Sequence, residues 1–387
     1  MIQNKKNSAP QALFGLTAAG KVFSCALAFA GCLSLNIYAV FACCAACFIA
    51  SVFLKERILC PDAFLTVPLV FVAESVGREV LAVTVLIGAA LYFLLSRIKN
   101  GIHMPASVML GASVGLAFCV TVLLTTYYFG IGAHGATAFE MLKNYRYLGF
   151  HPNWRGVFYG TITLFAMITY PFKFRTLSKY LPAEVVSLVI PFVLNLFLNP
   201  DGASTPILET GSVSSLNVPF FVRDYFPVGT AEPTVQTYAA AVAQGAFALA
   251  LILLIYSEKS GKIPLATASA NAASGILGGI PSLPAEIKSY SPSACAVAVA
   301  SVAAVGCLAP SLTARLPLHS LAVVLIVSAW KKVPFSGFSK MFGTEKAPGA
   351  VFFAASLASF VFLDVFKALV VCMLLAMLSR ASERRAA

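Results

Sequence analysis

The sequence predicts an all-α, polytopic membrane protein with about 14 segments, arranged as two inverted repeats of seven. The chain has 387 residues, of which 59% are hydrophobic and 11% are charged. Because a soluble domain carries about 25% charged residues, this composition indicates a membrane protein. The formal net charge is +12, but the basic residues lie in short clusters between apolar runs. That pattern is typical of loops at a membrane surface, and it argues against a nucleic-acid partner.

The ten cysteines are predicted to be free thiols. Most lie inside apolar runs, and no Cys/His metal spacing occurs. A lipoprotein leader ending at Cys32 is excluded because Lys21 interrupts its apolar core and further apolar runs follow. No Gly-rich phosphate loop or hydrolase spacing is present. We therefore expect no enzymatic activity, no cofactor and no metal.

Apolar segments can be followed in order along the chain. The first half holds two segments within 12–54, a third from Cys60, and runs at 79–96, 104–130, 157–171 and 181–198. A Pro-, Gly- and Ser-rich connection at 199–234 follows. The second half holds a run at about 236–256, a broken region, runs near 292–310 and 318–330, and two coupled runs within 349–379. The count is ambiguous by one or two, but fourteen segments fit.

The basic clusters support this count because they follow even-numbered segments, at 55–57, 97–99, 173–179, 259–262, 331–346 and 380–385. The positive-inside rule then places these clusters and both termini in the cytoplasm. The exception is a basic group in an outer loop, Lys143, Arg146 and Arg155. An odd number of spans in each half inverts the second half relative to the first, which is the inverted-repeat arrangement of many transporters.

The stretch SANAASGILGGIPSLPAEIKSY (269–290) is apolar but interrupted by Gly275, Gly278, Gly279, Pro281 and Pro284. A backbone break at membrane depth is tolerated only where protein or a water-filled cavity covers it. We expect a half-helix to begin near Pro284, with its free N–H groups and positive dipole end available to an anion. The first half has a counterpart, CPDAFLTVPLVFVAES from Cys60. The alternative interpretation is a Gly/Pro loop between two ordinary spans.

Several stretches resemble, in order, those of the SulP family of sulfate-permease anion transporters. PASVMLGASVGLA (105–117) resembles the start of that family's fifth span, and CPDA (60–63) its third half-helix. ANAASGILGGIP (270–281) is similar to the N-x-x-x-x-x-x-GG-x-P pattern before its tenth span. Other similar stretches are GLT (15–17), LPAEVVSLVIPFVLN (181–195), SSLNVP (214–219), LPLHSLAVVLIVSAW (316–330) and FLDVF (362–366).

The resemblance implies a core domain and a gate domain built from two intertwined repeats, with two half-helices meeting at mid-membrane. The core would comprise 12–100 and 235–312, and the gate 101–198 and 313–380. Residues 1–11 and 381–387 would be cytoplasmic ends, and 199–234 an extracytoplasmic connection. The family's cytoplasmic STAS domain has no counterpart in these residues, so the expected homodimer is a weak one through the gate spans.

The resemblance also implies an anion site between the two half-helices. The third half-helix would start at Asp62, Ala63 and Phe64, and the tenth at Ala285, Glu286, Ile287 and Lys288, while Cys25 and Phe29 would border the pocket from the first span. Cys25 stands where the family has a glutamine, which removes a polar contact, and Lys288 replaces an arginine, which loses bidentate geometry for an oxyanion.

Three acids are candidates for coupling transport to an ion, namely Asp62, Glu258 and Glu286. A protonated acid at the site would let a proton travel with the anion. Asp62 is equally well interpreted as the N-cap of the third half-helix. Glu258 can also be a solvated loop charge beside Lys259, and Lys288 can pair with Glu286 or extend toward the interface.

We therefore expect a secondary transporter of a small inorganic oxyanion, sulfate or bicarbonate, working by alternating access with H⁺ or Na⁺ as coupling ion. Its partners would be the anion, the coupling ion and membrane lipids. We expect it to be integral and multi-pass, in the bacterial inner (plasma) membrane. Two alternatives stay open: a proton-coupled carrier of a dicarboxylate or nucleobase, and a non-transporting membrane scaffold.

Overall fold

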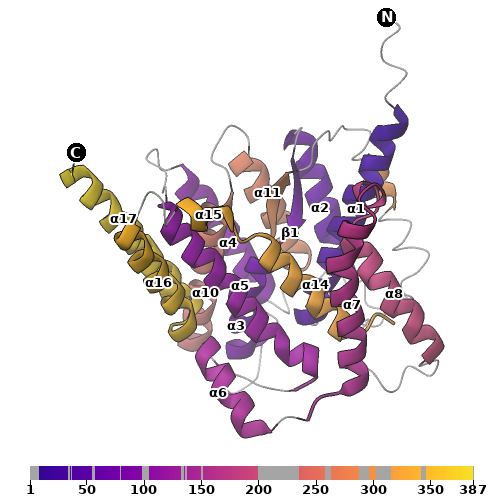
Figure 1. Cartoon of the computed structure of the whole chain (residues 1–387). Coiled ribbons are helices and arrows are strands. Elements are labelled where there is room, and N and C mark those ends of the chain that lie inside the picture. The colour runs from indigo at the N-terminus through magenta and orange to yellow at the C-terminus, as the bar shows by residue number, and fades with distance from the viewer. Residues whose placement is uncertain are drawn as a thin grey trace, which may run out of the picture.

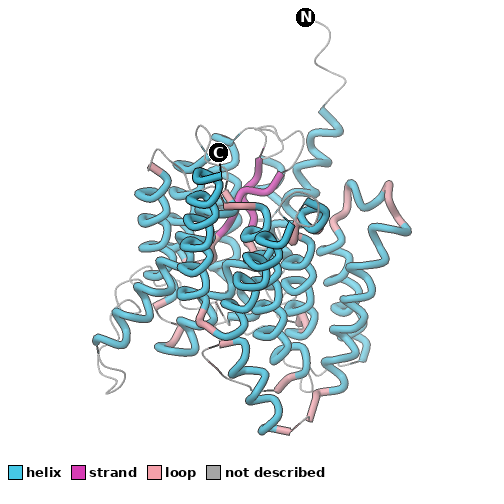
Figure 2. Tube along the Cα trace, turned by 60° about the vertical axis from the view of Figure 1, so that its left-hand side comes forward, coloured by secondary structure: helices cyan, strands magenta, loops and turns pink. Residues whose placement is uncertain are grey.

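The molecule is a bundle of helices around one short two-stranded sheet (Figures 1 and 2). The computed structural model describes the chain except for residues 1–7, 34, 36, 55–56, 79, 98–103, 132–134, 136, 150, 199–234, 258–262, 287–295, 302–314, 341–345 and 387. The first half contains α1 (Ser8–Leu33), α2 (Ile37–Leu54), β1 (Arg57–Pro61), α3 (Ala63–Val76), α4 (Leu81–Ser96), α5 (Ala106–Phe129), α6 (Ala138–Leu148), α7 (Trp154–Lys173), the 3₁₀ turn η1 (Leu177–Lys179) and α8 (Ala183–Leu198).

The second half contains α10 (Val235–Tyr256), α11 (Ile263–Leu277), β2 (Ser282–Glu286), α14 (Leu318–Lys331), α15 (Ser336–Lys340), α16 (Lys346–Phe362) and α17 (Val365–Ala386). Within the described part of the chain, four helices are long and apolar enough to cross a membrane: Phe14–Leu33, Ala106–Phe129, Gln236–Tyr256 and Leu318–Phe338. Several other apolar helices are shorter, including α3.

The two halves of the chain interlock. Helix α4 packs against α10 and α11, and α5 packs against α14 and α16. The only sheet among the described residues also joins the halves, because β1 pairs antiparallel with β2. Its register sets Ile58 opposite Ala285 and Cys60 opposite Leu283. Paired strands satisfy the backbone groups that the two broken segments would otherwise leave exposed at membrane depth.

The helical fold expected from the sequence is confirmed, and the structure adds one two-stranded sheet to it. This sheet corrects one expectation about the second broken segment. Pro284, Ala285 and Glu286 lie in β2, so the half-helix does not begin at any of these three residues. The reason is register: residues 282–286 pair with all five residues of β1, and that pairing requires an extended backbone.

Several helix ends lie at one end of the molecule. The start of α1 and the end of α17 lie at the same end of the molecule, and α7 and α14 also end there (Figure 1). Helix α6, which carries Lys143 and Arg146, lies at the opposite end. This helix is amphipathic, with a basic face and the exposed apolar residues Phe139 and Leu142. An amphipathic helix of this kind suits a membrane interface, which gives a physical reason for the exceptional basic loop.

Small residues set how closely the halves approach. At Gly111 of α5, an added Cβ would lie 2.7 Å from the Phe353 carbonyl oxygen and 2.7 Å from Ser356 Cβ, both on α16. Backbone cannot move aside as a flexible side chain can, so α5 and α16 depend on glycine here. Close approach at small residues is how membrane helices maximise packing.

We predict that Gly111→Ala lowers the melting temperature of the detergent-purified protein, because forced separation of packed elements costs about 1–3 kcal/mol. Gly337→Ala in α15 is the matched control, since its Cβ would meet Leu110 at an ordinary 3.7 Å. Equal melting temperatures for the two variants would show that the α5–α16 contact is not close-packed.

Candidate functional site

Helix α3 begins at the position that the sequence predicted. Asp62 is its N-cap, in an extended conformation, and Asp62 Oδ1 accepts a hydrogen bond from the Phe64 backbone N–H at 2.9 Å. Asp favours this position because its carboxylate satisfies an N–H group that has no partner within the helix. The strand β1 ends at Pro61 directly before it. The sheet therefore fixes where the start of α3 lies.

The strand β2 is held beside β1 by the buried side chain of Asn271 on α11. Asn271 Nδ2 donates to the carbonyls of Thr267 at 2.9 Å and Ser282 at 3.0 Å, and its Oδ1 accepts from the Ser282 N–H at 2.7 Å. Between them the chain turns through Gly278 and Gly279, whose φ angles are 149° and 81°. Only glycine adopts such angles readily. These bonds and angles give a physical reason for the N-x-x-x-x-x-x-GG spacing.

A lysine from the second half reaches the start of α3. Lys332 follows the last residue of α14, and its Nζ contacts Asp62 Oδ2 as an ion pair. The Asp62 side chain is 1% exposed, whereas the Lys332 side chain is 39% exposed. A carboxylate this deeply buried costs several kcal/mol unless it is paired. Lys332 thus stabilises the charged form of Asp62 while still reaching solvent.

A second lysine, Lys21, lies on α1, which packs closely against α8. Gly20 permits this packing, because an added Cβ at Gly20 would lie 2.8 Å from Val185 Cγ2 on α8. Lys21, the next residue, interacts electrostatically with Glu184 of α8 and with Cys60 of β1. Glu184 also lies 3.9 Å from Lys331 Nζ. We call Lys21, Asp62, Glu184, Lys331 and Lys332 the charged cluster. Three lysines face two carboxylates, so its net charge is positive.

Two thiols complete the described part of the site. Cys25 of α1 and Cys60 of β1 are both buried, and their side chains interact with each other. Both interact electrostatically with Lys21 and Lys332. The predicted free-thiol state is confirmed for the described cysteines, Cys25 and Cys60 among them. Thiols are weak hydrogen-bond donors, so the lysines supply most of the attraction for an anion here.

The aromatic residues predicted to line the pocket are packed in the core. Phe29 and Phe64 are fully buried. The Phe64 ring lies 5.1 Å from that of Tyr256, whose hydroxyl is 2.9 Å from Ser113 Oγ. Ala63 is buried beside Phe64, and Ala285 is partly buried on β2. Ile287, Lys288 and Glu258 lie outside the described residues, as does the side chain of Glu286.

Of the charged cluster, only Asp62 was singled out from the sequence as a site residue. Lys21 is the only charge within the first two apolar runs, and an ionisable residue inside a span is a functional candidate by default. That signal could have identified it. Lys331 and Lys332 look like an ordinary basic cluster at the end of a span. Their proximity to Glu184 and Asp62 is a property of the tertiary structure.

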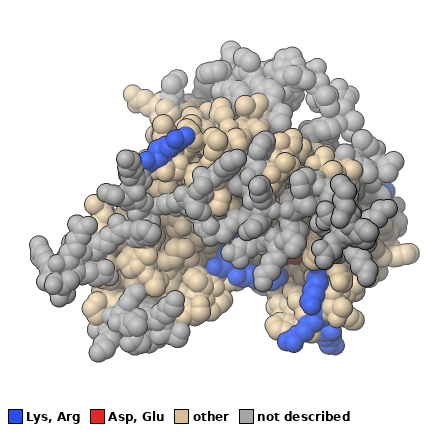
Figure 3. All heavy atoms as spheres, turned by 90° about the horizontal axis from the view of Figure 1, so that it is seen from above, with Lys and Arg blue, Asp and Glu red and all other residues tan. Residues whose placement is uncertain are grey.

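The face on which both termini lie carries basic side chains, as Figure 3 shows. Acidic atoms are nearly absent among the coloured, described residues visible on this face. The charged cluster includes Lys331 and Lys332, which are exposed. Among the coloured residues on this face, the charged side chains are therefore mainly basic.

The fold matches those of known anion transporters. The transmembrane domain of BicA, a cyanobacterium bicarbonate transporter, aligns with a TM-score of 0.72 and 18% identity over 96% of this chain and 98% of its own. Murine solute carrier 26 family member A9, an anion transporter in its inward-facing state, aligns with a TM-score of 0.75 and 13% identity over 98% of this chain and 69% of its own. Another structure of SLC26A9 has a TM-score of 0.74 at 14% identity, over 96% of this chain and 64% of its own.

No protein-family model and no curated protein sequence matches the chain. The structural matches nevertheless cover nearly all of it. At these identities they establish the fold. The chain therefore has the fold of SulP and solute carrier 26 anion transporters, which confirms the fold expected from the motifs.

We predict that Asn271→Leu destabilises the protein, because Ser282 would lose its partners for both N–H and C=O. Each buried group left unpaired costs about 1–3 kcal/mol. Thermal unfolding in detergent measures the effect. Ser282→Ala is the matched control, since it keeps both backbone bonds. A melting temperature of Asn271→Leu equal to that of this control would mean that the amide does not hold β2.

Proposed function

We propose that the chain is a secondary active transporter that moves a small inorganic oxyanion, sulfate or bicarbonate, across the membrane by alternating access. The observation that carries this proposal is the contact of Lys332 with Asp62 at the start of α3. Lys21 adds a second positive charge, since it interacts with Cys60 of β1, the strand directly before α3. A helix start offers free N–H groups and a positive dipole end, and broken helices hold substrates in many transporters. The fold shared with anion transporters supports the same function.

The proposed site combines the start of α3 with the residues that follow β2. Cys25, Asp62, Ala63 and Ala285 would surround the anion, Phe29 and Phe64 would form its apolar wall, and Glu286, Ile287 and Lys288 would close it from the second repeat. Lys21 and Lys332 are added here because the fold brings them to the same place. Charge on lysine attracts the anion without the bidentate geometry of arginine.

Coupling is proposed to run through an acid, with H⁺ or Na⁺ as the ion. Asp62 is the described candidate, since it is buried and touches the proposed site. Glu258 and Glu286 stay candidates from the sequence. A proton on Asp62 would remove a negative charge that repels the anion. A proton-coupled carrier of a dicarboxylate or nucleobase would use the same acid, and the choice of substrate separates the two functions.

We further propose the two-part division into core (12–100 and 235–312) and gate (101–198 and 313–380), moving as largely rigid bodies. The end of the molecule that carries both termini would face the cytoplasm of a bacterial cell. The positive-inside rule supports this orientation. A weak homodimer would form through the gate helices.

The first test is uptake of labelled bicarbonate and sulfate into proteoliposomes, with and without a pH or sodium gradient. We expect uptake of one of them, accelerated by the gradient of the coupling ion. Organic acids and nucleobases are tested in parallel. Uptake of only an organic substrate would replace the oxyanion assignment, and uptake of none would favour the scaffold alternative.

Charge-removing variants test the site. We expect Lys21→Met and Lys288→Ala each to reduce the initial uptake rate at least tenfold, because each removes a positive charge from the path of the anion. Lys143→Met on α6 is the control, since α6 lies at the opposite end of the molecule (Figure 1). Wild-type uptake by Lys288→Ala would remove that lysine from the site, and wild-type uptake by Lys21→Met would do the same for Lys21.

A further inference from the structure

Asp62 is an anion that the chain itself places at the start of α3. One carboxylate oxygen accepts the Phe64 N–H at 2.9 Å, and the other contacts the ammonium of Lys332. These are the attractions that a transported anion would use, namely a free helix N–H and a lysine. Asp62 and the substrate therefore compete for Lys332.

Of the two partners, Lys332 is the one able to move. Asp62 is fixed by its hydrogen bond to the helix it caps, and its side chain is 1% exposed. Lys332 lies after the last turn of α14 with a side chain that is 39% exposed. A lysine ammonium sits on a flexible four-carbon stem with three rotatable donors. It can turn from Asp62 to a second anion without any change in the backbone.

The ion pair also joins the two proposed bodies. Asp62 belongs to the core through α3, and Lys332 belongs to the gate through α14. By contrast, the neighbouring Lys331–Glu184 pair joins α14 to α8, which are both gate helices. Breaking the Asp62–Lys332 pair therefore loosens the core from the gate, whereas breaking its neighbour does not.

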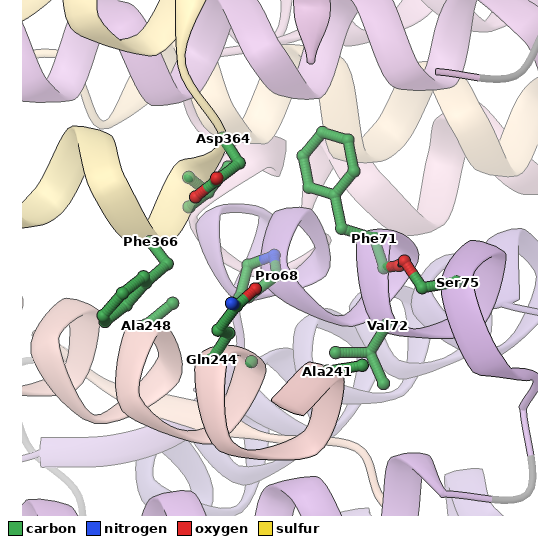
Figure 4. Close-up of a pocket in the computed structure, with 11 residues that line it drawn as sticks. Pro68, Phe71, Val72, Ser75, Ala241, Gln244, Ala248, Asp364 and Phe366 are labelled. Atoms are coloured by element: carbon green, nitrogen blue, oxygen red, sulfur yellow. The ribbon is translucent and has the colours of Figure 1, made fainter. Parts of the chain in front are cut away.

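The far half of α3 leaves space for such a movement. A cavity of about 150 Å³ lies there between core and gate. Figure 4 shows the residues that line it: Pro68, Phe71 and Val72 come from α3, and Gln244 and Ala248 from α10. Asp364, in the turn between α16 and α17, and Phe366, at the start of α17, complete the lining. This pocket is partly open to the outside of the molecule. A rotation of the gate that opened the ion pair at one end of α3 would narrow the pocket at the other end.

We propose that the Asp62–Lys332 ion pair is the gate latch of the anion site, and that Lys332 exchanges the Asp62 carboxylate for the transported anion. Anion binding and release of the core from the gate are then one event. This inference rests on the proposed anion transport, and it adds Lys332 as a residue that contacts the substrate.

The test measures anion affinity through Trp330, which lies two residues before Lys332 on α14. Its indole N–H donates to Thr121 Oγ1 at 2.9 Å, so the fluorophore has a fixed place near the latch. In a Trp154→Phe background Trp330 is the only tryptophan, because the chain has two. Bicarbonate, sulfate and chloride are titrated against the purified protein, and the half-saturating concentration of each is read from the fluorescence change.

We expect Asp62→Asn to lower the half-saturating concentration about tenfold, because asparagine keeps the helix cap but no longer competes for Lys332. Lys332→Met is expected to raise it at least tenfold. Lys143→Met on α6, at the opposite end of the molecule (Figure 1), is the control and is expected to stay within twofold of the parent. Asp62→Ser, which also caps but carries no charge, should reproduce the tighter binding.

The direction in which the Asp62 substitutions change the anion affinity decides between the possible roles of Asp62. Unchanged affinity in both Asp62→Asn and Asp62→Ser would mean that Asp62 is only a cap, and weaker affinity would make it a direct ligand of the substrate. Either result overturns the latch. If the parental protein transports an anion but Asp62→Asn does not bind that anion more tightly than the parent, only the latch is refuted. Parental protein that neither binds nor transports any of the three anions refutes the proposed anion transport as well.

A second measurement does not depend on transport. The melting temperatures of Asp62→Asn, Lys332→Met and the double variant form a cycle that isolates the coupling between the two side chains. Without anion, we expect the melting temperature of the double variant to fall by less than the sum of the decreases in the two single variants. At a saturating concentration of the anion that binds most tightly, we expect this coupling to disappear. Coupling that is equal with and without the anion would contradict the exchange.

Discussion

The structure depends on one constraint, which is that backbone polar groups at membrane depth must be paired. Two segments of this chain cannot run as continuous helices, because Pro61 interrupts the first and a run of glycines and prolines interrupts the second. The fold satisfies both by pairing β1 with β2. Since the strands come from different halves of the chain, the same hydrogen bonds that repair the breaks also join the repeats and place the start of α3.

The charged cluster follows from the position of the start of α3 inside the protein. A helix that starts inside the protein needs a cap, and Asp62 supplies one. A buried carboxylate then needs a cation, which Lys332 provides from α14. Lys21 and Glu184 are drawn into the same region because Gly20 lets α1 approach α8. The charged cluster is thus linked, step by step, to the break before α3, and its net positive charge is the feature most relevant to an anion.

The positions of the glycines divide into two kinds with different consequences. Gly278 and Gly279 are needed for their φ angles, which turn the chain from α11 into β2. Gly111 and Gly20 are needed for close approach between helices. The first kind leaves a spacing that can be recognised in the sequence, because the turn and the Asn271 hydrogen bonds require a fixed number of residues. The glycines needed for close approach leave no such spacing, and in the sequence they appear only as a general enrichment in small residues.

The sequence by itself predicted the membrane class and the order of segments, because hydropathy is a local property. It offered Asp62 as one possible cap, and it indicated the transporter fold through its resemblance to the SulP motifs. It did not determine where the second break becomes extended, since β2 is fixed by pairing with β1 rather than by the residues around Pro284. Nor did it identify Lys332 as the partner of Asp62. Those residues lie 270 positions apart along the chain, and only the packing of α14 beside α3 brings their charges together.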